Sequence, residues 1–138
     1  MRRRLLTIVV IGGGFSGVEV AGAITEVAEH ALRFYTTLKR ERAQIILLQH
    51  GNSLIPELSA PSLSNFAAAK LRQAGVDVRL DSGAKEVTAT GVRLNNGELI
   101  EAATVVATVG TSPNPFIEKL GLPLQHGRLA TNPDMSVP

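Results

Sequence analysis

The chain has 138 residues, 44% of them hydrophobic and 19% charged, which is the composition of one globular domain rather than of a disordered chain. Fourteen Lys and Arg against twelve Asp and Glu leave a formal net charge of +2, so composition does not favour a nucleic-acid partner. Cysteine is absent, which excludes disulfides and thiol nucleophiles, and the three scattered histidines lack metal-ligand spacing, so we expect no metal site.

The first predicted strand covers residues 5–11, a run that is apolar except for Thr7 and suits a strand covered on both faces. A helix is predicted from about Phe15 to about Arg40, because apolar residues recur at helical spacing over that range. Such a helix would be about 40 Å long at ~1.5 Å per residue. The strand beneath it would span only about 23 Å. We therefore expect the helix to overhang the sheet or to bend.

Three further elements complete the predicted parallel part of the fold. Pro56 and Pro61 predict a loop after the second strand, because proline stops regular structure. Ser62 or Ser64 is expected to cap the next helix, and Gly75 to end it. The predicted elements are a strand at residues 44–49, a helix that runs to Ala74 and a strand at residues 76–80.

The sequence then changes to short β-type runs over residues 84–102, divided at Gly91 and at Asn95-Asn96-Gly97. Asn-Gly is a strong hairpin signal because both central positions of a type I′ turn need φ > 0. We predict three small antiparallel strands here, followed by a last buried strand within residues 104–110. Five of the seven prolines lie in the final 26 residues, which predicts a mostly irregular tail.

This order of elements indicates an α/β fold: a Rossmann-like, doubly wound parallel sheet with right-handed crossovers, joined by a three-stranded antiparallel β-meander. We expect residues 1–138 to form a single domain. No apolar run is long enough to cross a bilayer, so no transmembrane span is expected. No signal peptide is expected either, because glycines follow the first apolar run where a cleavage site should be.

Gly12, Gly14 and Gly17 form a G-x-G-x-x-G pattern between the first predicted strand and the first predicted helix, the context that a dinucleotide-binding turn requires. In such a turn the first glycine permits a tight bend, the second lets the backbone approach a pyrophosphate, and the third lets the helix pack close on the strand. The phosphates would lie on the free N–H groups of Phe15 and Ser16, at the positive end of the helix. The pattern therefore predicts a dinucleotide site.

Two polar residues beside this turn each have two interpretations. Glu19 either stabilises the start of the helix through the helix dipole or lies beside a nicotinamide. Gln49 ends the second strand, where this fold usually keeps an acid for the adenosine ribose. Glutamine can hydrogen-bond a hydroxyl but brings no charge. His50, which follows it, faces either a 2′-phosphate or solvent.

Two other patterns are interpreted as structural. Tyr35 and Lys39 match the Y-x-x-x-K pairing of short-chain dehydrogenases, but they lie far along the predicted helix from the glycine turn, so we expect an ordinary i, i+4 contact. A basic cluster consists of Arg33, Lys39, Arg40 and Arg42. It falls where that helix should end, and cations there complement the helix dipole; contact with anionic lipid is the alternative.

Five stretches, in order, resemble the pyridine-nucleotide domain of two-dinucleotide flavoproteins, the disulfide-reductase superfamily. They are "VVIGGGFSGVEVAGAI", "LIPELS", "LRQAGVDVRL", "LNNGELIEAATVVATVGTSPNP" and "GRLATNPDMSVP", and together they extend over nearly the whole chain. Within the superfamily, "GFSGVEVAGAI" and the long helix before the second strand resemble type II NADH dehydrogenases, with carotenoid-type and sulfide:quinone relatives as alternatives.

This resemblance implies an NADH-binding domain that presents the nicotinamide to FAD held elsewhere in a parent NADH:quinone oxidoreductase. NADP(H) is an alternative dinucleotide, because Gln49 departs from the acid usual in NADH-using members. The resemblance assigns Glu19 to the nicotinamide and flavin, and Gly110 to a close passage of the backbone by the nucleotide. The expected cofactor-binding residues are Gly12, Gly13, Gly14, Phe15, Ser16, Gly17, Glu19, Gln49 and Gly110, and no catalytic residue is expected in this chain.

The resemblance also implies partners. The FAD domain needs its own glycine turn and a Gly-Asp motif, which this sequence lacks, and residues 131–138 resemble the start of the return to that domain. We therefore expect this chain alone to be inactive and without FAD, with the FAD domain and a quinone or other acceptor as partners in the parent. The expected location is cytoplasmic, or peripheral at the cytoplasmic membrane face for the parent. The alternatives are a stand-alone NAD(H)-sensing regulatory module and a turn that binds FAD.

Overall fold

The structure, a computed structural model, describes residues 2–35, 42–110, 114–125 and 127–137. Its centre is a parallel sheet of four strands in the order β3-β2-β1-β7. The α/β class, the Rossmann-like parallel sheet and the separate three-stranded antiparallel meander are confirmed. The elements of the sheet and its helices are β1 (Thr7–Ile11), α2 (Phe15–Leu32), β2 (Gln44–Leu48), α3 (Pro61–Gln73), β3 (Asp77–Arg79) and β7 (Thr104–Ala107).

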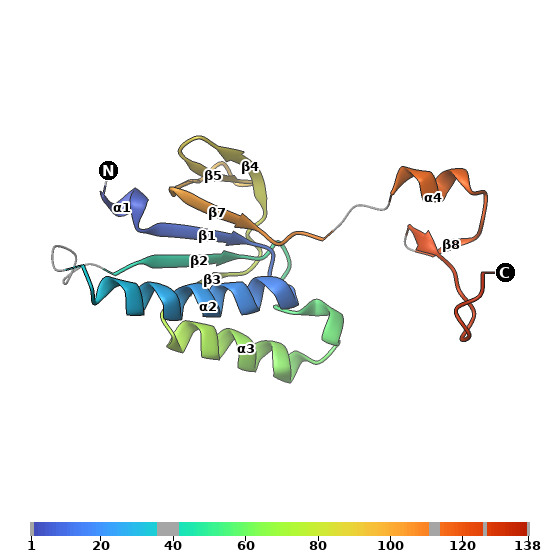
Figure 1. The fold of residues 1–138 in the computed structure, drawn as a ribbon, viewed down its shortest axis with the longest axis horizontal. Coiled ribbons are helices and arrows are strands. Elements are labelled where there is room, and N and C mark those ends of the chain that lie inside the picture. The colour runs from blue at the N-terminus through green and yellow to red at the C-terminus, as the bar shows by residue number, and fades with distance from the viewer. Residues whose placement is uncertain (1, 36–41, 111–113, 126, 138) are drawn as a thin grey trace.

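Each face of the parallel sheet is covered by a different layer. Helices α2 and α3 lie on one face, and the meander of β4 (Ala84–Thr88), β5 (Gly91–Leu94) and β6 (Leu99–Glu101) lies on the other (Figure 1). Successive residues of a strand point to opposite faces, so Val10 packs toward the helices and Val9 toward the meander. The covering of both faces explains why the strands are apolar throughout rather than alternating.

The first strand begins two residues later than predicted, because Arg2–Leu5 forms a short helix, α1. The N–H of Leu6 donates to the carbonyl oxygen of Arg2, and the hydroxyl of Thr7 donates to the carbonyl oxygen of Arg3 at 2.8 Å. Parallel pairing starts only where Thr7 meets Gln44 of β2. Before that point the backbone makes local helical hydrogen bonds instead of ladder bonds to β2.

Helix α2 ends at Leu32, so its predicted continuation is wrong as far as Tyr35, and residues 36–40 of that prediction lie outside the described part of the chain. The apolar periodicity does continue, but the side chain of Phe34 is 75% exposed and that of Tyr35 is exposed as well. Neither ring is buried against the described part of the chain. An apolar repeat extends a helix only where its side chains pack on another surface, so the repeat after Leu32 did not lengthen α2.

Two turn predictions also need correction. Helix α3 begins with Pro61 as its first residue after Ala60 as N-cap, so neither Ser62 nor Ser64 caps it. Proline fits this position because the first helical N–H has no intrahelical acceptor. Between β5 and β6 only Gly97 has a positive φ, of 90°, so the turn is not type I′. The connection is longer than two residues, which removes the demand for two left-handed positions.

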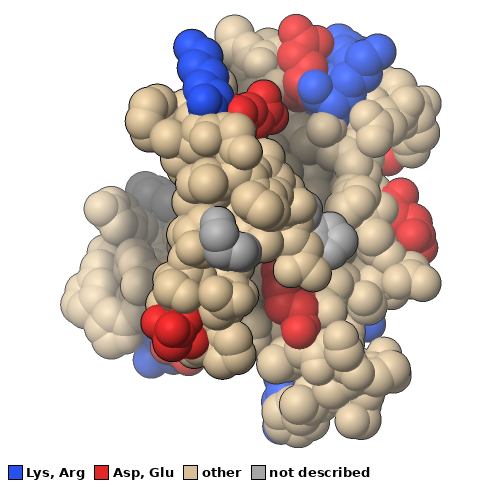
Figure 2. Space-filling view, turned by 90° about the vertical axis from the view of Figure 1, so that its right-hand side faces the viewer, with Lys and Arg blue, Asp and Glu red and all other residues tan. Residues whose placement is uncertain are grey.

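The segment after β7 does not share the core of the sheet. It contains α4 (Pro115–Lys119), β8 (Leu124–Gln125) and β9 (Arg128–Leu129), so it is more regular than predicted. None of the described residues between 114 and 137 is buried, and the side chains of Phe116 and Met135 are 61% and 76% exposed. The face turned to the viewer in Figure 2 carries mostly uncharged surface, with its acidic and basic side chains interspersed.

Truncation after Gly110 should therefore leave the folded sheet nearly unchanged. We expect the free energy of unfolding to stay within about 1 kcal/mol of that of the full chain, because the removed residues bury little. Urea unfolding followed by far-UV circular dichroism measures this difference. A loss of more than about 2 kcal/mol would show that residues 114–137 pack on the sheet in solution.

Candidate functional site

The candidate site lies at the carboxyl end of the parallel strands, where β1 turns into α2 (Figure 1). Ligands of open parallel sheets bind in the crevice outside this edge. The turn consists of Gly12, Gly13 and Gly14, and the N–H of Gly12 continues the sheet by donating to the carbonyl oxygen of Leu48 at 2.8 Å. The glycine turn is therefore an extension of the sheet edge rather than a free loop.

Gly12 and Gly17 have the structural roles expected of them. Gly12 has φ of 108°, a left-handed conformation that side chains rarely adopt. Gly17 lies so close to the turn that a Cβ added to it would overlap the carbonyl oxygen of Gly12. Helix α2 can reach this position on the strand only without a side chain at that point.

Thr108, which the sequence analysis missed, ties the last strand to the turn. Its N–H donates to the carbonyl oxygen of Ile11 at 2.8 Å, and its hydroxyl donates to the carbonyl oxygens of Ile11 at 2.9 Å and of Gly12 at 3.1 Å. The last strand, β7, lies at the edge of the sheet and is at most half-buried, so its prediction as a buried strand is wrong; a hydroxyl residue directly after it was the available sequence signal. Its partners are 96 and 97 residues away in the chain, so local patterning could not reveal them.

Gly14 is the open position of the turn. It is the N-cap of α2, and no side-chain hydrogen bond caps the helix among the described residues. The first N–H groups of an α-helix lack intrahelical acceptors, and the helix dipole adds positive potential there. Phe15 and Ser16 are exposed at this end of the helix. The arrangement can receive an anion such as a phosphate.

The structure places Gln49 beneath the turn rather than at its surface. The side chain is 7% exposed, and its amide is used at both ends. Oε1 accepts a hydrogen bond from the N–H of Gly13 at 3.0 Å, and Nε2 donates to the carbonyl oxygen of Ser53 at 3.2 Å. Gln49 therefore joins the turn to the loop that follows β2. The expected contact with a ribose stays a prediction.

That loop packs directly on the turn. The N–H of Ile55 donates to the carbonyl oxygen of Gly13 at 2.7 Å, and the side chain of Leu54 is fully buried. A Cβ added to Gly13 would lie 2.7 Å from a methyl carbon of Leu54, so this glycine also makes room for packing. The next element, the 3-10 helix η2 (Pro56–Leu58), brings Glu57 to Gly14. The sequence analysis did not assign a role to Glu57, although it lies within the quoted stretch "LIPELS".

The remaining expected residues lie on the surface around the turn. Glu19 is exposed on α2, and Gly110 is exposed after β7 with open space around its Cα. His50 is exposed after Gln49. Among the described residues, no hydrogen bond or ion pair joins Glu19 to another side chain. The expected contacts of Glu19 and Gly110 with a bound nucleotide therefore stay predictions.

Arg79 is the cation beside Gln49, since its carbonyl oxygen accepts the N–H of Gln49 at 2.9 Å. Its guanidinium is held by Asp77 and by Glu98 of the meander, each at 2.9 Å. Partial burial lowers the pKa of Arg79, but the hydrogen bonds to these two carboxylates raise it, and the net shift is upward. The guanidinium therefore links the sheet to the meander and is committed to two carboxylates.

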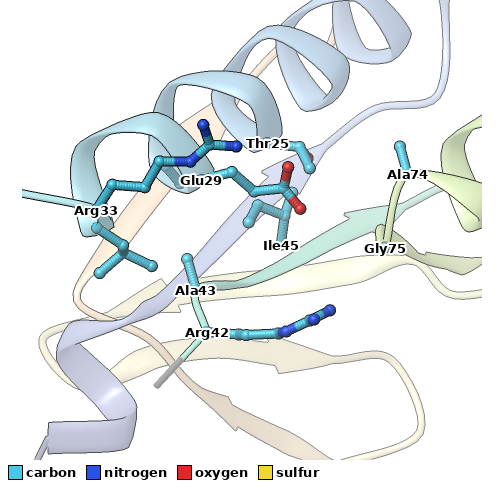
Figure 3. Close-up of a pocket in the computed structure, with 10 residues that line it drawn as sticks. Thr25, Glu29, Arg33, Arg42, Ala43, Ile45, Ala74 and Gly75 are labelled. Atoms are coloured by element: carbon cyan, nitrogen blue, oxygen red, sulfur yellow. The ribbon is translucent and has the colours of Figure 1, made fainter. Parts of the chain in front are cut away.

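A hollow of the surface lies away from the glycine turn. It measures about 580 Å³ and is formed by the end of α2, the start of β2 and the residues after α3. Figure 3 shows Glu29 of α2, Arg33 just after the end of α2 and Arg42, which lies two residues before β2, around this hollow. This is the amino end of the parallel strands, opposite the edge where ligands of such sheets bind. Size alone does not identify the site in this chain.

No group of three or more His, Cys, Asp or Glu side chains within the described part of the chain is arranged to hold a metal ion. None of its helices combines the length and the apolar character that crossing a bilayer requires.

Comparisons with known proteins agree with this geometry. The sequence profile described as pyridine nucleotide-disulphide oxidoreductase matches residues 1–138. The type II NADH:quinone oxidoreductase Ndh of Mycobacterium tuberculosis is 33% identical over 147 residues, covering 99% of this chain and 32% of that protein. Demethylphylloquinone reductase NdbB of Synechocystis is 30% identical, covering 96% of this chain and 31% of that protein. The chain thus spans about a third of the length of these curated relatives.

Solved structures show the same fold. NDH2 from Plasmodium falciparum, solved in complex with NADH, superposes with a TM-score of 0.72 at 17% identity and covers 79% of this chain and 23% of its own. Putidaredoxin reductase, in its covalent complex with putidaredoxin, superposes with a TM-score of 0.68 at 27% identity and covers 94% of this chain and 30% of its own.

The contact of Gly17 with the turn predicts that alanine at Gly17 lowers the free energy of unfolding far more than alanine at Gly14 does. Gly17→Ala should lower the free energy of unfolding by more than about 2 kcal/mol, because the new methyl group meets the Gly12 carbonyl. Gly14→Ala should change it by less than about 1 kcal/mol, since only the flexible end of Glu57 is near. Urea unfolding of both variants measures the difference, and equal losses would contradict the close approach.

The hydrogen bonds of Gln49 predict that a carboxylate is not tolerated there without cost. Gln49→Glu keeps an acceptor for the N–H of Gly13 but replaces the donor to Ser53 by an oxygen that faces a carbonyl. We expect the free energy of unfolding to fall by about 1–3 kcal/mol. Gln125→Glu, the same change at an exposed position in β8, is the control and should have little effect. Equal urea unfolding curves for the two variants would disprove the hydrogen bonds that the buried Gln49 side chain makes to Gly13 and Ser53.

Proposed function

The chain belongs to the pyridine nucleotide-disulphide oxidoreductase family, and we propose that it is the NAD(H)-binding domain of a flavin-dependent NADH dehydrogenase of the NADH:quinone oxidoreductase type. The relatives named above support this class. The chain spans about a third of the length of these relatives, so the activity of the whole enzyme is proposed here and is not established for this chain.

The geometry of the glycine turn is the observation that carries this proposal. A dinucleotide needs a place where two phosphates can approach the backbone and meet N–H groups. Gly14 leaves that space free of backbone and Cβ atoms, and α2 presents its uncapped end to it. The residues present therefore fit a pyrophosphate, and those proposed to hold it are Gly12, Gly13, Gly14, Phe15, Ser16 and Gly17.

Two further residues are proposed to act toward the other half of the dinucleotide. Glu19, exposed on the second turn of α2, would lie beside the nicotinamide, and Gly110 would let the backbone pass close to it. Bound NAD(H) supplies a hydride, and the chain's own residues would orient the ring that carries it. We assign the hydride acceptor, FAD, to a separate domain of the parent protein and the final electron acceptor to a quinone.

The segment after Gly110 supports the proposal of a partner domain. None of its described residues is buried, and Phe116, Leu120 and Met135 are among its exposed apolar side chains. Apolar side chains gathered on a segment without a core indicate a surface that another protein surface covers. We propose that the flavin domain covers it. The cytoplasmic location, with peripheral attachment of the parent to the cytoplasmic membrane face as an option, belongs to the same proposal.

The preference between the two dinucleotides is proposed to be weak. Gln49 is uncharged, so no carboxylate at the end of β2 repels a 2′-phosphate. The adjacent cation, Arg79, is bound by Asp77 and Glu98, so it does not offer a free charge that would favour NADPH. Neither form of the cofactor is selected strongly by these residues.

Substitution of Gly14 tests the proposed function. Gly14→Val should abolish binding of NADH while keeping the fold, because the side chain occupies the space that the pyrophosphate needs. Isothermal titration calorimetry with NADH measures the affinity of the chain and of the variant, and circular dichroism checks that the variant is folded. Gly22→Val, on the same helix but away from the turn, is the control and should bind as the unchanged chain does. Unchanged NADH affinity in Gly14→Val would place the nucleotide elsewhere.

A further inference from the structure

Glu57 is the one carboxylate among the described residues that stands at the open position of the glycine turn. Its Oε1 and Oε2 atoms lie 3.3 and 3.9 Å from the position that a Cβ on Gly14 would take. Gly14 is the N-cap of α2, the residue before the helix end at which the dipole attracts negative charge. No hydrogen bond or ion pair holds the Glu57 side chain to another described residue. The carboxylate is therefore placed at the turn without being fastened to it.

The placement of Glu57 follows from how its loop is anchored. Gln49 holds the carbonyl of Ser53, and the N–H of Ile55 is bound to Gly13, so the chain is attached to the turn just before η2. Ile55 and Ser59, which flank η2, have φ of 48° and 47°. Left-handed conformations are unfavourable for residues with a Cβ, and especially for a β-branched one. Backbone strain of this kind persists only where the surroundings impose it.

These observations bring a carboxylate to the glycine that a pyrophosphate would approach under the proposed function. A carboxylate and a pyrophosphate cannot share the positive end of one helix without repulsion, because like charges a few Å apart disfavour each other. A dinucleotide that binds at Gly14 must displace the carboxylate or bind beside it. Either way its affinity is lower than the turn alone would allow.

We propose that Glu57 is a competing anion that lowers the affinity of the turn for dinucleotides and does so equally for NADH and NADPH. The inference rests on the proposed function, since it concerns the same site. It assigns Glu57 to the pyrophosphate, which the two cofactors share, and not to the adenosine ribose, where they differ. Affinity and cofactor preference are then set by different residues, the first by Glu57 and the second by the end of β2.

The test compares the full chain with Glu57→Gln by calorimetric titration with NADH, NADPH and ADP. Glutamine keeps the size of the side chain and removes its charge. We expect the variant to bind all three about three- to tenfold more tightly at low ionic strength, with an unchanged NADH:NADPH ratio. The gain should shrink at about 0.5 M salt, because screening weakens repulsion between exposed charges. Glu26→Gln, the same charge change at an exposed position on α2, is the control and should have little effect.

The outcomes separate the inference from the function on which it rests. Equal and measurable affinities of the chain and of Glu57→Gln would overturn the inference alone. So would a loss of affinity for NADH only, which would show a ribose contact, or an equal gain in Glu26→Gln, which would show a net-charge effect. Absence of binding by both the chain and Glu57→Gln, with both folded, would overturn the proposed function and the inference with it.

Discussion

The close approach of α2 to the end of β1 is the constraint on which the rest of the structure depends. The backbone at Gly17 faces the carbonyl oxygen of Gly12 with no room for a Cβ between them. Because of this contact the helix begins directly over the sheet edge, and its free N–H groups open toward the crevice. A side chain at Gly17 would push the helix away, and with it the positive end that makes the edge attractive to an anion.

Around this contact, the turn is held from three sides by residues distant in the chain. Thr108 bonds to the carbonyls of Ile11 and Gly12, Gln49 accepts from Gly13, and Ile55 donates to Gly13. Buried backbone groups that lack partners are costly, so each tie also satisfies a polar group of the turn. The result is a rigid turn whose one open position is Gly14. A site that must receive a flexible dinucleotide gains from such preorganisation.

The electrostatics of the site come from the backbone more than from side chains. The helix end supplies the positive potential, Arg79 is bound by two carboxylates, and Glu57 adds a negative charge in front of Gly14. Under the proposed function, this chain would bind its dinucleotide without a cationic clamp.

The sequence alone determined the order of the sheet strands, their two helices and the meander, the α/β class and the position of the glycine turn, because these follow from local patterns. Apolar runs covered on both faces, the G-x-G-x-x-G spacing and the Asn-Gly signal each act within a few residues. Only the tertiary structure decided where α2 ends, what Gln49 binds and which carboxylate stands at Gly14. The helix ends at Leu32 although its periodicity continues, and the apolar rings of Phe34 and Tyr35 beyond it are exposed. Gln49 meets Gly13 across 36 residues, and Glu57 meets Gly14 through a strained loop, so the physical cause in both cases is a contact between segments that no local pattern encodes.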